Sequence, residues 1–237
     1  MTTPRKKIAK SRLEALAPER APEPLGPAAT DDLQGDPGDT RSRILQAAVK
    51  EFASEGYGGA RVERICATAR SNPRMLYHYF GDKAALYVAV LEHVLQMLRA
   101  EEVKLGVDDM EPLAGIMKLF EFVNGHFGSH PELHQLLSGE NLLRAAFLRG
   151  SRRVRVESSP LIEILARLLR RGERGGAFRR GIDPLHLYVL IVSLCYYHRS
   201  NAYTLSVLFE TDLTARSWQD EHEDYARQML RSFLIRR

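Results

Sequence analysis

The sequence predicts an all-α protein of about nine helices, with a small N-terminal three-helix domain followed by a larger helical domain. From Thr40 onwards, large apolar residues recur every three or four positions, which is the spacing of one face of an α-helix. A capping residue followed by proline, as in Asn72-Pro73 and Asp183-Pro184, marks the start of several segments. No segment shows sustained alternation of apolar and polar residues, so we expect no β-sheet.

The composition fits a folded globular protein. The chain has 237 residues, of which 44% are hydrophobic and 27% charged, enough for a sizeable core. The formal net charge of +4 weakly favours a polyanionic partner but does not identify one.

Cysteine usage and hydropathy indicate the compartment. Cys66 and Cys195 match no metal or redox spacing, and we interpret them as free thiols of a reducing environment. The N-terminus lacks the apolar core of a signal peptide, and the most apolar run, residues 187–197, is half as long as a membrane span. We therefore expect a cytoplasmic protein with no membrane contact and no cofactor.

Residues 1–38 differ in composition from the rest. Six of the 11 prolines fall there and large apolar side chains are few, so this extension is predicted to be disordered. Its beginning is basic, through Arg5, Lys6, Lys7, Lys10 and Arg12. Two interpretations stay open: an arm that follows a nucleic-acid backbone, or a solvating tail without a partner.

Three helices are expected within residues 39–87. The first begins at Thr40 and ends in the glycines of "EGYGG", and the second covers about 62–69. After the turn "RSN", Asn72 is placed as the N-cap of a third helix and Pro73 as its first residue. Asp82 can cap a longer helix from Lys83 to about residue 105.

A helical wheel separates the two faces of the third helix. Leu76, Phe80 and Pro73 form a narrow apolar face, and Tyr79 is expected to be half-buried. The outward set is Arg74, Met75, Tyr77 and His78.

Short helices joined by a three-residue turn suggest a helix-turn-helix. The outward set suits DNA, because arginine can donate two bonds to guanine O6 and N7, and methionine can touch a thymine methyl. Tyrosine and histidine side chains reach phosphate oxygens, and the helix beginning at Lys83 offers another phosphate site. The alternative is an ordinary amphipathic helix with a solvated polar face.

Residues 40–87, "TRSRILQAAVKEFASEGYGGARVERICATARSNPRMLYHYFGDKAALY", resemble the DNA-binding domain of the tetracycline-repressor (TetR) family of bacterial regulators. The resemblance rests on an ordered pattern: Ile44, Ala47-Ala48, Phe52, Gly56-Tyr57, Val62, Ile65, Ala69, Leu76-Tyr77, Phe80, Lys83 and Leu86. It implies phosphate contacts for Tyr77, Tyr79 and Lys83. The wheel assigns base contacts to Arg74, Met75 and His78, and Arg61 and Arg70 are further candidates for contact with the DNA backbone.

The chain departs from the family pattern at the turn and in the third helix. Arg70 replaces the usual glycine at a position that commonly needs positive φ, so we expect either about 1 kcal/mol of backbone strain or a rebuilt turn. Arg74-Met75 replaces Gly-Thr, and Tyr79 replaces histidine. Because Arg74 and Met75 lie where bases would be read, no known operator sequence can be transferred to this chain.

After residue 110 the resemblance is weaker, as expected for the family's ligand-binding and dimerisation domain, which we assign to residues 88–237. Helices are expected at 111–128, 131–149, 159–174, 184–200 and 216–235. The resemblance implies that the last two pair with those of a second copy. The helix 184–200 is apolar nearly all round and needs cover on more than one side, although its own monomer could supply that cover.

A small-molecule effector pocket is expected among residues 110–175. Its candidate lining residues, each of which could instead be plain core, are Phe120, Phe127, Leu136, Leu143 and Phe147.

His126, His130 and His134 stand at four-residue spacing, which on an unbroken helix could hold a metal ion. Gly128 and Pro131 interrupt that helix, so we assign no metal site. A metal-binding protein or enzyme that uses these histidines stays the alternative function, and a nucleoid-type DNA binder without a ligand is a third. The leading hypothesis is a ligand-responsive repressor that binds a palindromic operator in double-stranded DNA as a homodimer.

Overall fold

A computed structural model describes residues 37–151, 153 and 160–236. The predicted disordered extension lies outside the described residues, except for Pro37 and Gly38, which begin the first helix. Helices dominate the described part of the chain, where the single β-type pairing is an isolated bridge between Phe178 and Ile235. The all-α prediction is confirmed.

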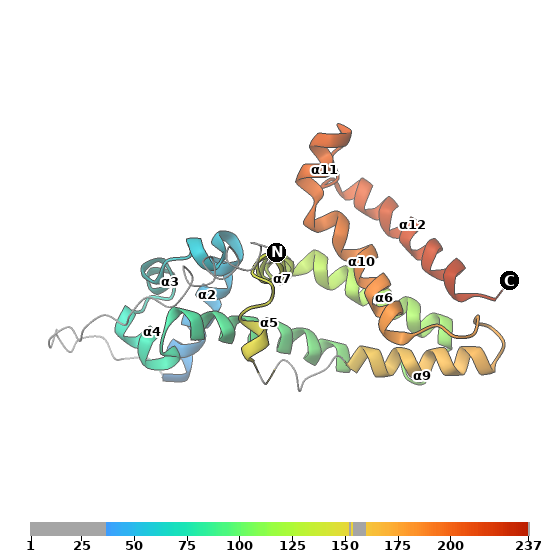
Figure 1. Cartoon of the computed structure of the whole chain (residues 1–237), viewed down its shortest axis with the longest axis horizontal. Helices are drawn as coiled ribbons and strands as arrows, with labels where there is room; N and C mark the ends of the chain where they lie inside the picture. The colour runs from blue at the N-terminus through green and yellow to red at the C-terminus, as the bar shows by residue number, and fades with distance from the viewer. Residues whose placement is uncertain (1–36, 152, 154–159, 237) are drawn as a thin grey trace, which may run out of the picture.

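The N-terminal half consists of α2 (Pro37–Gly59), α3 (Val62–Thr68), α4 (Pro73–Phe80) and α5 (Lys83–Val103). The other half consists of α6 (Pro112–Ser129), α7 (Pro131–Leu142), η1 (Leu148–Gly150), α9 (Pro160–Arg174), α10 (Pro184–Ser200), α11 (Ala202–Phe209) and α12 (Arg216–Leu234). Figure 1 shows α2, α3 and α4 clustered at one end of an elongated molecule, with α5 running from that cluster towards α9. Among the described residues, no helix is both long and apolar enough to cross a membrane.

The N-terminal core forms where the apolar faces of α2 to α5 meet. Ile44, Phe52, Ile65, Leu76 and Leu86 are each at most 1% exposed. Burying side chains of this size stabilises the fold by about 1.5–3 kcal/mol each. This core fixes the direction in which α4 presents its outer face.

The second half of the chain also contributes to this N-terminal core. Helix α7 packs along α2, and its Leu136, 1% exposed, completes the core. The predicted domain boundary between residues 87 and 88 falls inside α5, which runs through both halves. The division of the chain into domains stays a prediction.

A separate C-terminal core joins α6, α9, α10 and α12. Its buried side chains include Leu119, Phe120, Leu168, Ile191 and Leu230. A polar network adds to it, because Asn124 of α6 donates to Glu223 of α12 at 2.6 Å and accepts from Arg199 of α10 at 3.2 Å. The last long helix is thereby tied to both of its neighbours.

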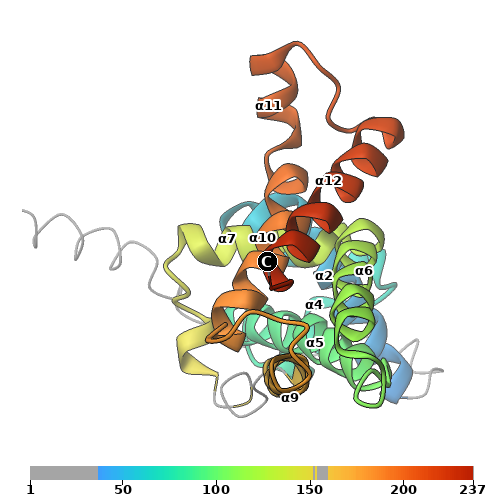
Figure 2. The same cartoon turned by 90° about the vertical axis from the view of Figure 1, so that its right-hand side faces the viewer.

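Two elements differ from the sequence-based expectation. The helix predicted for 131–149 ends at Leu142, because Arg144 and Ala145 adopt positive φ values of 58° and 55°. Helix α11, between α10 and α12, was not predicted. It projects away from the body of the molecule (Figure 2).

Candidate DNA-binding site

The start of α4 is fixed by its own sequence. Asn72 is the N-cap, and its side-chain oxygen accepts from the Met75 backbone N–H at 3.0 Å. Pro73 occupies the first turn, where a missing N–H costs nothing. Leu76 and Phe80 are buried against α2 and α5 and anchor the helix. The predicted cap and inner face are confirmed.

The outer face carries the predicted base-reading residues. Arg74 and His78 are exposed, whereas Met75, Tyr77 and Tyr79 are half-buried beside the N-terminal core. The ring centroids of His78 and Tyr79 lie 5.2 Å apart in an edge-on arrangement. Pro73, which the wheel places on the apolar side, is exposed at the start of the helix. The contacts of these side chains with DNA stay a prediction.

The turn between α3 and α4 contains a strained residue. Arg70 has a φ of 49°, in the left-handed region, so of the two expected outcomes the structure has the strained turn. The Ser71 N–H donates to the Cys66 carbonyl at 2.9 Å, and Arg43 Nε donates to the Ala69 carbonyl at 3.2 Å. Arg43 therefore braces the turn from α2, a role that sequence spacing does not reveal because 26 residues separate the pair.

Lys83 has a structural role beside its predicted phosphate contact. Its ammonium group donates to the Ala60 carbonyl at 2.7 Å and lies 4.9 Å from the centroid of the Tyr57 ring. Asp82 caps α5, as predicted, by accepting from the Ala85 N–H at 2.7 Å. The lysine thus ties the beginning of α5 to the segment before α3.

The cations around α3 differ in how far they are neutralised. Arg64 forms ion pairs with Glu51 at 2.7 Å and with Glu55 at 3.4 Å. Arg61 is exposed at the N-cap of α3, and its backbone N–H, rather than its guanidinium, donates to Glu51. Arg61, Arg70 and Arg74 therefore present guanidinium groups to solvent at this end of the molecule.

The five candidate effector residues divide between the two cores. Phe120 and Phe127 lie in the C-terminal core, whereas Leu136 lies in the N-terminal one. Phe147 packs on rings of the N-terminal half, and Leu143 is partly exposed. The structure does not bring the five together, and their role in binding an effector stays a prediction.

Of the three histidines, His126 and His130 contact each other, whereas His134 lies beside a different residue. His126 is buried, and its Nδ1 lies 2.9 Å from Glu101 Oε2. Burial lowers the pKa of His126, and the Glu101 carboxylate opposes that shift. The His130 ring stacks on that of His126 at 4.3 Å, whereas His134 lies beside Tyr196. The described part of the chain holds no group of three or more His, Cys, Asp or Glu side chains that could bind a metal ion.

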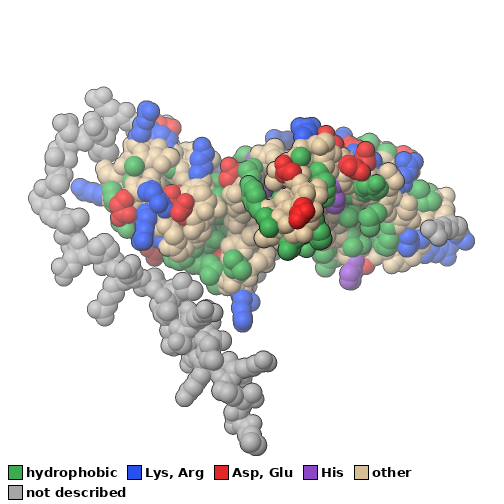
Figure 3. Space-filling model, turned by 90° about the horizontal axis from the view of Figure 1, so that it is seen from above, with side chains coloured by type: hydrophobic (Ala, Val, Ile, Leu, Met, Phe, Trp, Pro, Cys, Tyr) green, Lys and Arg blue, Asp and Glu red, His purple; other side chains and the backbone are tan. Residues whose placement is uncertain are grey.

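Helices α10 and α12 leave large apolar side chains uncovered. Leu187, Ile191 and Cys195 of α10 face the C-terminal core. On its other face and on α12, the exposed apolar side chains are Leu185, Val189, Leu190, Tyr197, Tyr225 and Met229. Figure 3 shows hydrophobic side chains beside the projecting α11 on this side of the molecule. The single chain thus leaves uncovered the helix pair that was predicted to meet a second copy.

Comparison with known proteins matches both halves of the chain. The family described as "Bacterial regulatory proteins, tetR family" matches residues 44–90, and "Tetracyclin repressor-like, C-terminal domain" matches residues 112–230. The HTH-type transcriptional repressor NicS of Pseudomonas putida is 39% identical over 73% of this chain and 82% of its own length. The HTH-type transcriptional regulator RutR of Escherichia coli is 30% identical over 64% of this chain and 69% of its own.

Solved structures share the fold. SCO4942 from Streptomyces coelicolor superposes with a TM-score of 0.62 over 84% of this chain and 99% of its own, at 23% identity. Together with the helix-turn-helix geometry of α3 and α4, these matches establish that the chain belongs to the TetR family and is a DNA-binding transcriptional regulator, not an enzyme.

Proposed function

We propose that the protein is a ligand-responsive repressor that binds a palindromic operator as a homodimer in the bacterial cytoplasm. The observation that carries the proposal is the division of α4 into two faces. Leu76 and Phe80 fix the helix to the core, and Arg74 and His78 point outward from it. A helix held in this way can enter a major groove without losing its own packing.

The homodimer is supported by the uncovered faces of α10 and α12. Val189 and Tyr197 of α10 are 53% and 59% exposed, and Tyr225 and Met229 of α12 are 59% and 63% exposed. A two-fold axis through this surface would cover both helices and would place two copies of α4 on one side of the dimer. Two such reading heads fit half-sites about 34 Å apart, one turn of DNA.

Effector response is supported by direct packing between the two halves of the chain. Leu136 of α7 lies in the N-terminal core, and Phe147 contacts Tyr57 and Tyr87. A ligand that favours one position of α7 would therefore also shift α2, and with it the spacing of the two reading heads. Such a ligand changes DNA affinity only by its own difference in affinity for the two arrangements.

The support for repression, rather than activation, is the sequence similarity to NicS. NicS is named a transcriptional repressor, and it is 39% identical to this chain. We carry that direction of control over to this chain as part of the proposal.

The test is selection of bound sequences from random DNA, followed by gel shifts at several salt concentrations on the selected site and on DNA upstream of the protein's own gene. We expect a palindrome with half-sites one helical turn apart, and weaker binding as salt rises. The same gel shifts are run with Val189→Asp, which places a charge on the proposed dimer face and leaves α4 unchanged. We expect this variant to bind the palindrome more weakly than wild type. A single unrepeated half-site, bound equally well by wild type and by this variant, would contradict the dimeric operator complex.

A further inference from the structure

Helix α11 projects from the molecule with little packing against its own chain. It follows α10 directly and stands beyond the end of the α10–α12 pair (Figures 1 and 2). The exposed fractions of its large apolar side chains are 82% for Tyr203, 80% for Val207, 72% for Leu208 and 68% for Phe209. Four neighbouring apolar side chains at such exposure mark an interaction surface.

Hydrogen bonds within the segment hold its shape, and of its residues only Ala202 and Leu213, at the two ends, are buried. Ser206 is central: its hydroxyl oxygen accepts from the Leu213 N–H at 2.9 Å, and its carbonyl accepts from the Thr211 N–H at 3.2 Å. Asp212 accepts from the Thr214 N–H at 2.9 Å. We call residues 202–213 the arm. Between these buried ends, the large apolar side chains of the arm are exposed and available to another surface.

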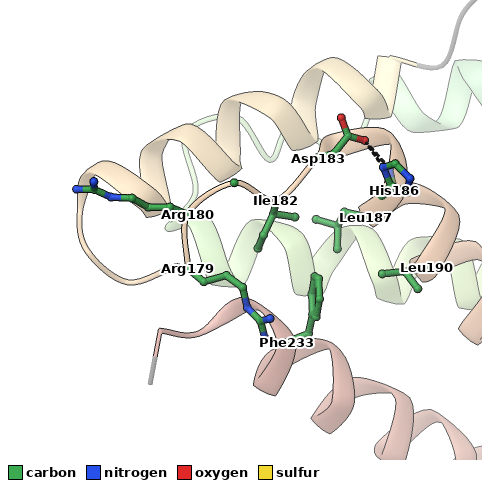
Figure 4. Close-up of a pocket in the computed structure, with 9 residues that line it drawn as sticks. Arg179, Arg180, Ile182, Asp183, His186, Leu187, Leu190 and Phe233 are labelled. Carbon is green, nitrogen blue, oxygen red and sulfur yellow. Dashed lines mark hydrogen bonds and ion pairs between the residues drawn. The ribbon is translucent and has the colours of Figure 1, made fainter.

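A pocket lies at the opposite end of α10. It has a volume of about 330 Å³ and is formed by the segment between α9 and α10, the first turns of α10 and the end of α12. Its lining residues are Arg179, Arg180, Gly181, Ile182, Asp183, His186, Leu187, Leu190 and Phe233. Figure 4 shows Ile182, Leu187, Leu190 and Phe233 gathered as an apolar wall, so the pocket suits an apolar side chain.

The charges of the arm and the pocket are complementary. Glu210 and Asp212 are exposed at the tip of the arm, and hydrogen bonds from Thr214 lower the pKa of Asp212, which keeps it ionised. At the pocket, Arg179 lies over the Phe233 ring at 4.2 Å, and Arg180 extends outward into solvent (Figure 4). An acidic tip beside apolar side chains thus matches an apolar pocket with a basic rim.

We propose that the arm of one copy seats in this pocket of a second copy, and reciprocally. The inference rests on the proposed homodimer. Helix α10 has 17 residues and is about 25 Å long, with the pocket at its beginning and the arm at its end. In a two-fold dimer in which the two α10 helices cross antiparallel near their middles, the end of one lies beside the beginning of the other. Each arm, continuing past α10, then reaches the partner's pocket.

The proposal assigns the segment Arg179–Asp183 to the dimer interface, although it lies outside the α10–α12 face. The pocket also lies next to the proposed dimer face, because its lining residues Leu190 and Phe233 belong to α10 and α12, which carry the exposed apolar side chains. Exposed apolar side chains thus occur near the pocket, on both helices and on the arm. A second copy seated in the proposed way would cover them together.

The first test measures dimer dissociation of the full chain by analytical ultracentrifugation. We expect the double variant Val207→Ser/Phe209→Ser to raise the dissociation constant at least tenfold. The matched control is Leu142→Ser, because Leu142 on α7 is 86% exposed and lies outside the proposed contact. A wild-type chain that stays monomeric would remove the homodimer and this inference together. A dimeric wild type whose dissociation constant is unchanged in the double variant would overturn the seating of the arm alone.

The second test locates the contact. Arg180→Glu is expected to weaken the dimer, because two acidic residues then face each other. Combining it with Glu210→Arg reverses the charges of the pair and is expected to restore most of the lost dimer affinity. In a separate variant, Ile182→Cys with Phe209→Cys should form disulfide-linked dimers on oxidation, whereas each single variant should not; the native Cys66 and Cys195 are buried. Cross-linking by Phe209→Cys alone would show that the arms contact each other and would overturn the proposal.

Discussion

The ring of Phe147, which follows α7, lies with its centroid 4.5 Å from that of Tyr57 in α2 and 4.9 Å from that of Tyr87 in α5. The ammonium group of Lys83 also lies near Tyr57, 4.9 Å from the centroid of its ring. Tyr57 thus contacts both a residue of the predicted effector domain and a predicted phosphate contact. This contact is a direct physical route between the two halves of the chain.

Phe147→Ala is expected to lower the free energy of unfolding by about 2 kcal/mol, somewhat less than for a fully buried phenylalanine. Urea unfolding of Phe147→Ala, Tyr57→Leu and the double variant gives the coupling between the two rings, which we expect to be about 0.5–1.5 kcal/mol. Strict additivity of the two single changes would show that the rings are neighbours without energetic coupling.

The segment that carries Phe147 was not predictable from sequence. Arg144 and Ala145 are both in the left-handed region, although neither residue favours it and no glycine or proline marks the spot. Glu140, 1% exposed, holds this turn, because its side chain accepts from the Leu148 N–H at 3.1 Å and its carbonyl accepts from the Ala145 N–H at 2.7 Å. Tertiary packing of Phe147 overrides the local preference for continued helix, and periodicity cannot reveal such a contact.

At α4 the sequence was a better guide, since local rules decide its structure. The Asn72 cap, the Pro73 start and the buried Leu76 and Phe80 follow from capping chemistry and helical period. The brace from Arg43 and the bond from Lys83 to Ala60 did not follow, because each joins residues more than 20 positions apart in the chain.

Arg70→Gly is expected to raise the free energy of unfolding by about 1 kcal/mol. Arg70 holds a φ of 49°, and glycine adopts that conformation without the steric cost that Cβ imposes. Thermal or urea unfolding measures the gain. Arg70→Ala is the control, since it removes the guanidinium but keeps Cβ; an equal gain in both variants would assign the effect to charge and not to backbone strain.

The same two variants separate strain from DNA contact. If the Arg70 guanidinium contacts a phosphate, both should bind the selected operator more weakly, and the slope of log affinity against log salt should fall by about one. Unchanged affinity and slope in both variants would leave Arg70 with a structural cost and no part in binding.

Arg74→Ala is expected to weaken binding to the preferred operator by about 1–3 kcal/mol and to relax the preference at one base position in each half-site. Arg74→Lys keeps the positive charge but cannot form the bidentate hydrogen bonds of arginine. Compared with Arg74→Ala, it should therefore restore affinity for the operator more than base specificity. Selection from random DNA with each variant measures both effects. Equal weakening on all sequences would reassign Arg74 to phosphate contact.

His198 predicts a pH dependence of stability that originates in the α10–α12 contact. It is 4% exposed and packs against the rings of Trp218 and His222, and burial, with the nearby His222 and Arg199, lowers its pKa to about 4. The His198 imidazole is protonated near pH 6.5 in the unfolded chain but only near pH 4 in the folded chain. The contribution of neutral His198 to the free energy of unfolding is therefore complete above pH 6.5 and is lost as the pH falls towards 4. Between pH 7 and pH 5 the free energy of unfolding is expected to fall by about 2 kcal/mol for this reason. His198→Leu should remove that part of the loss in urea unfolding, whereas His186→Leu, at an exposed site, should not; parallel pH profiles for wild type and His198→Leu would contradict the assignment.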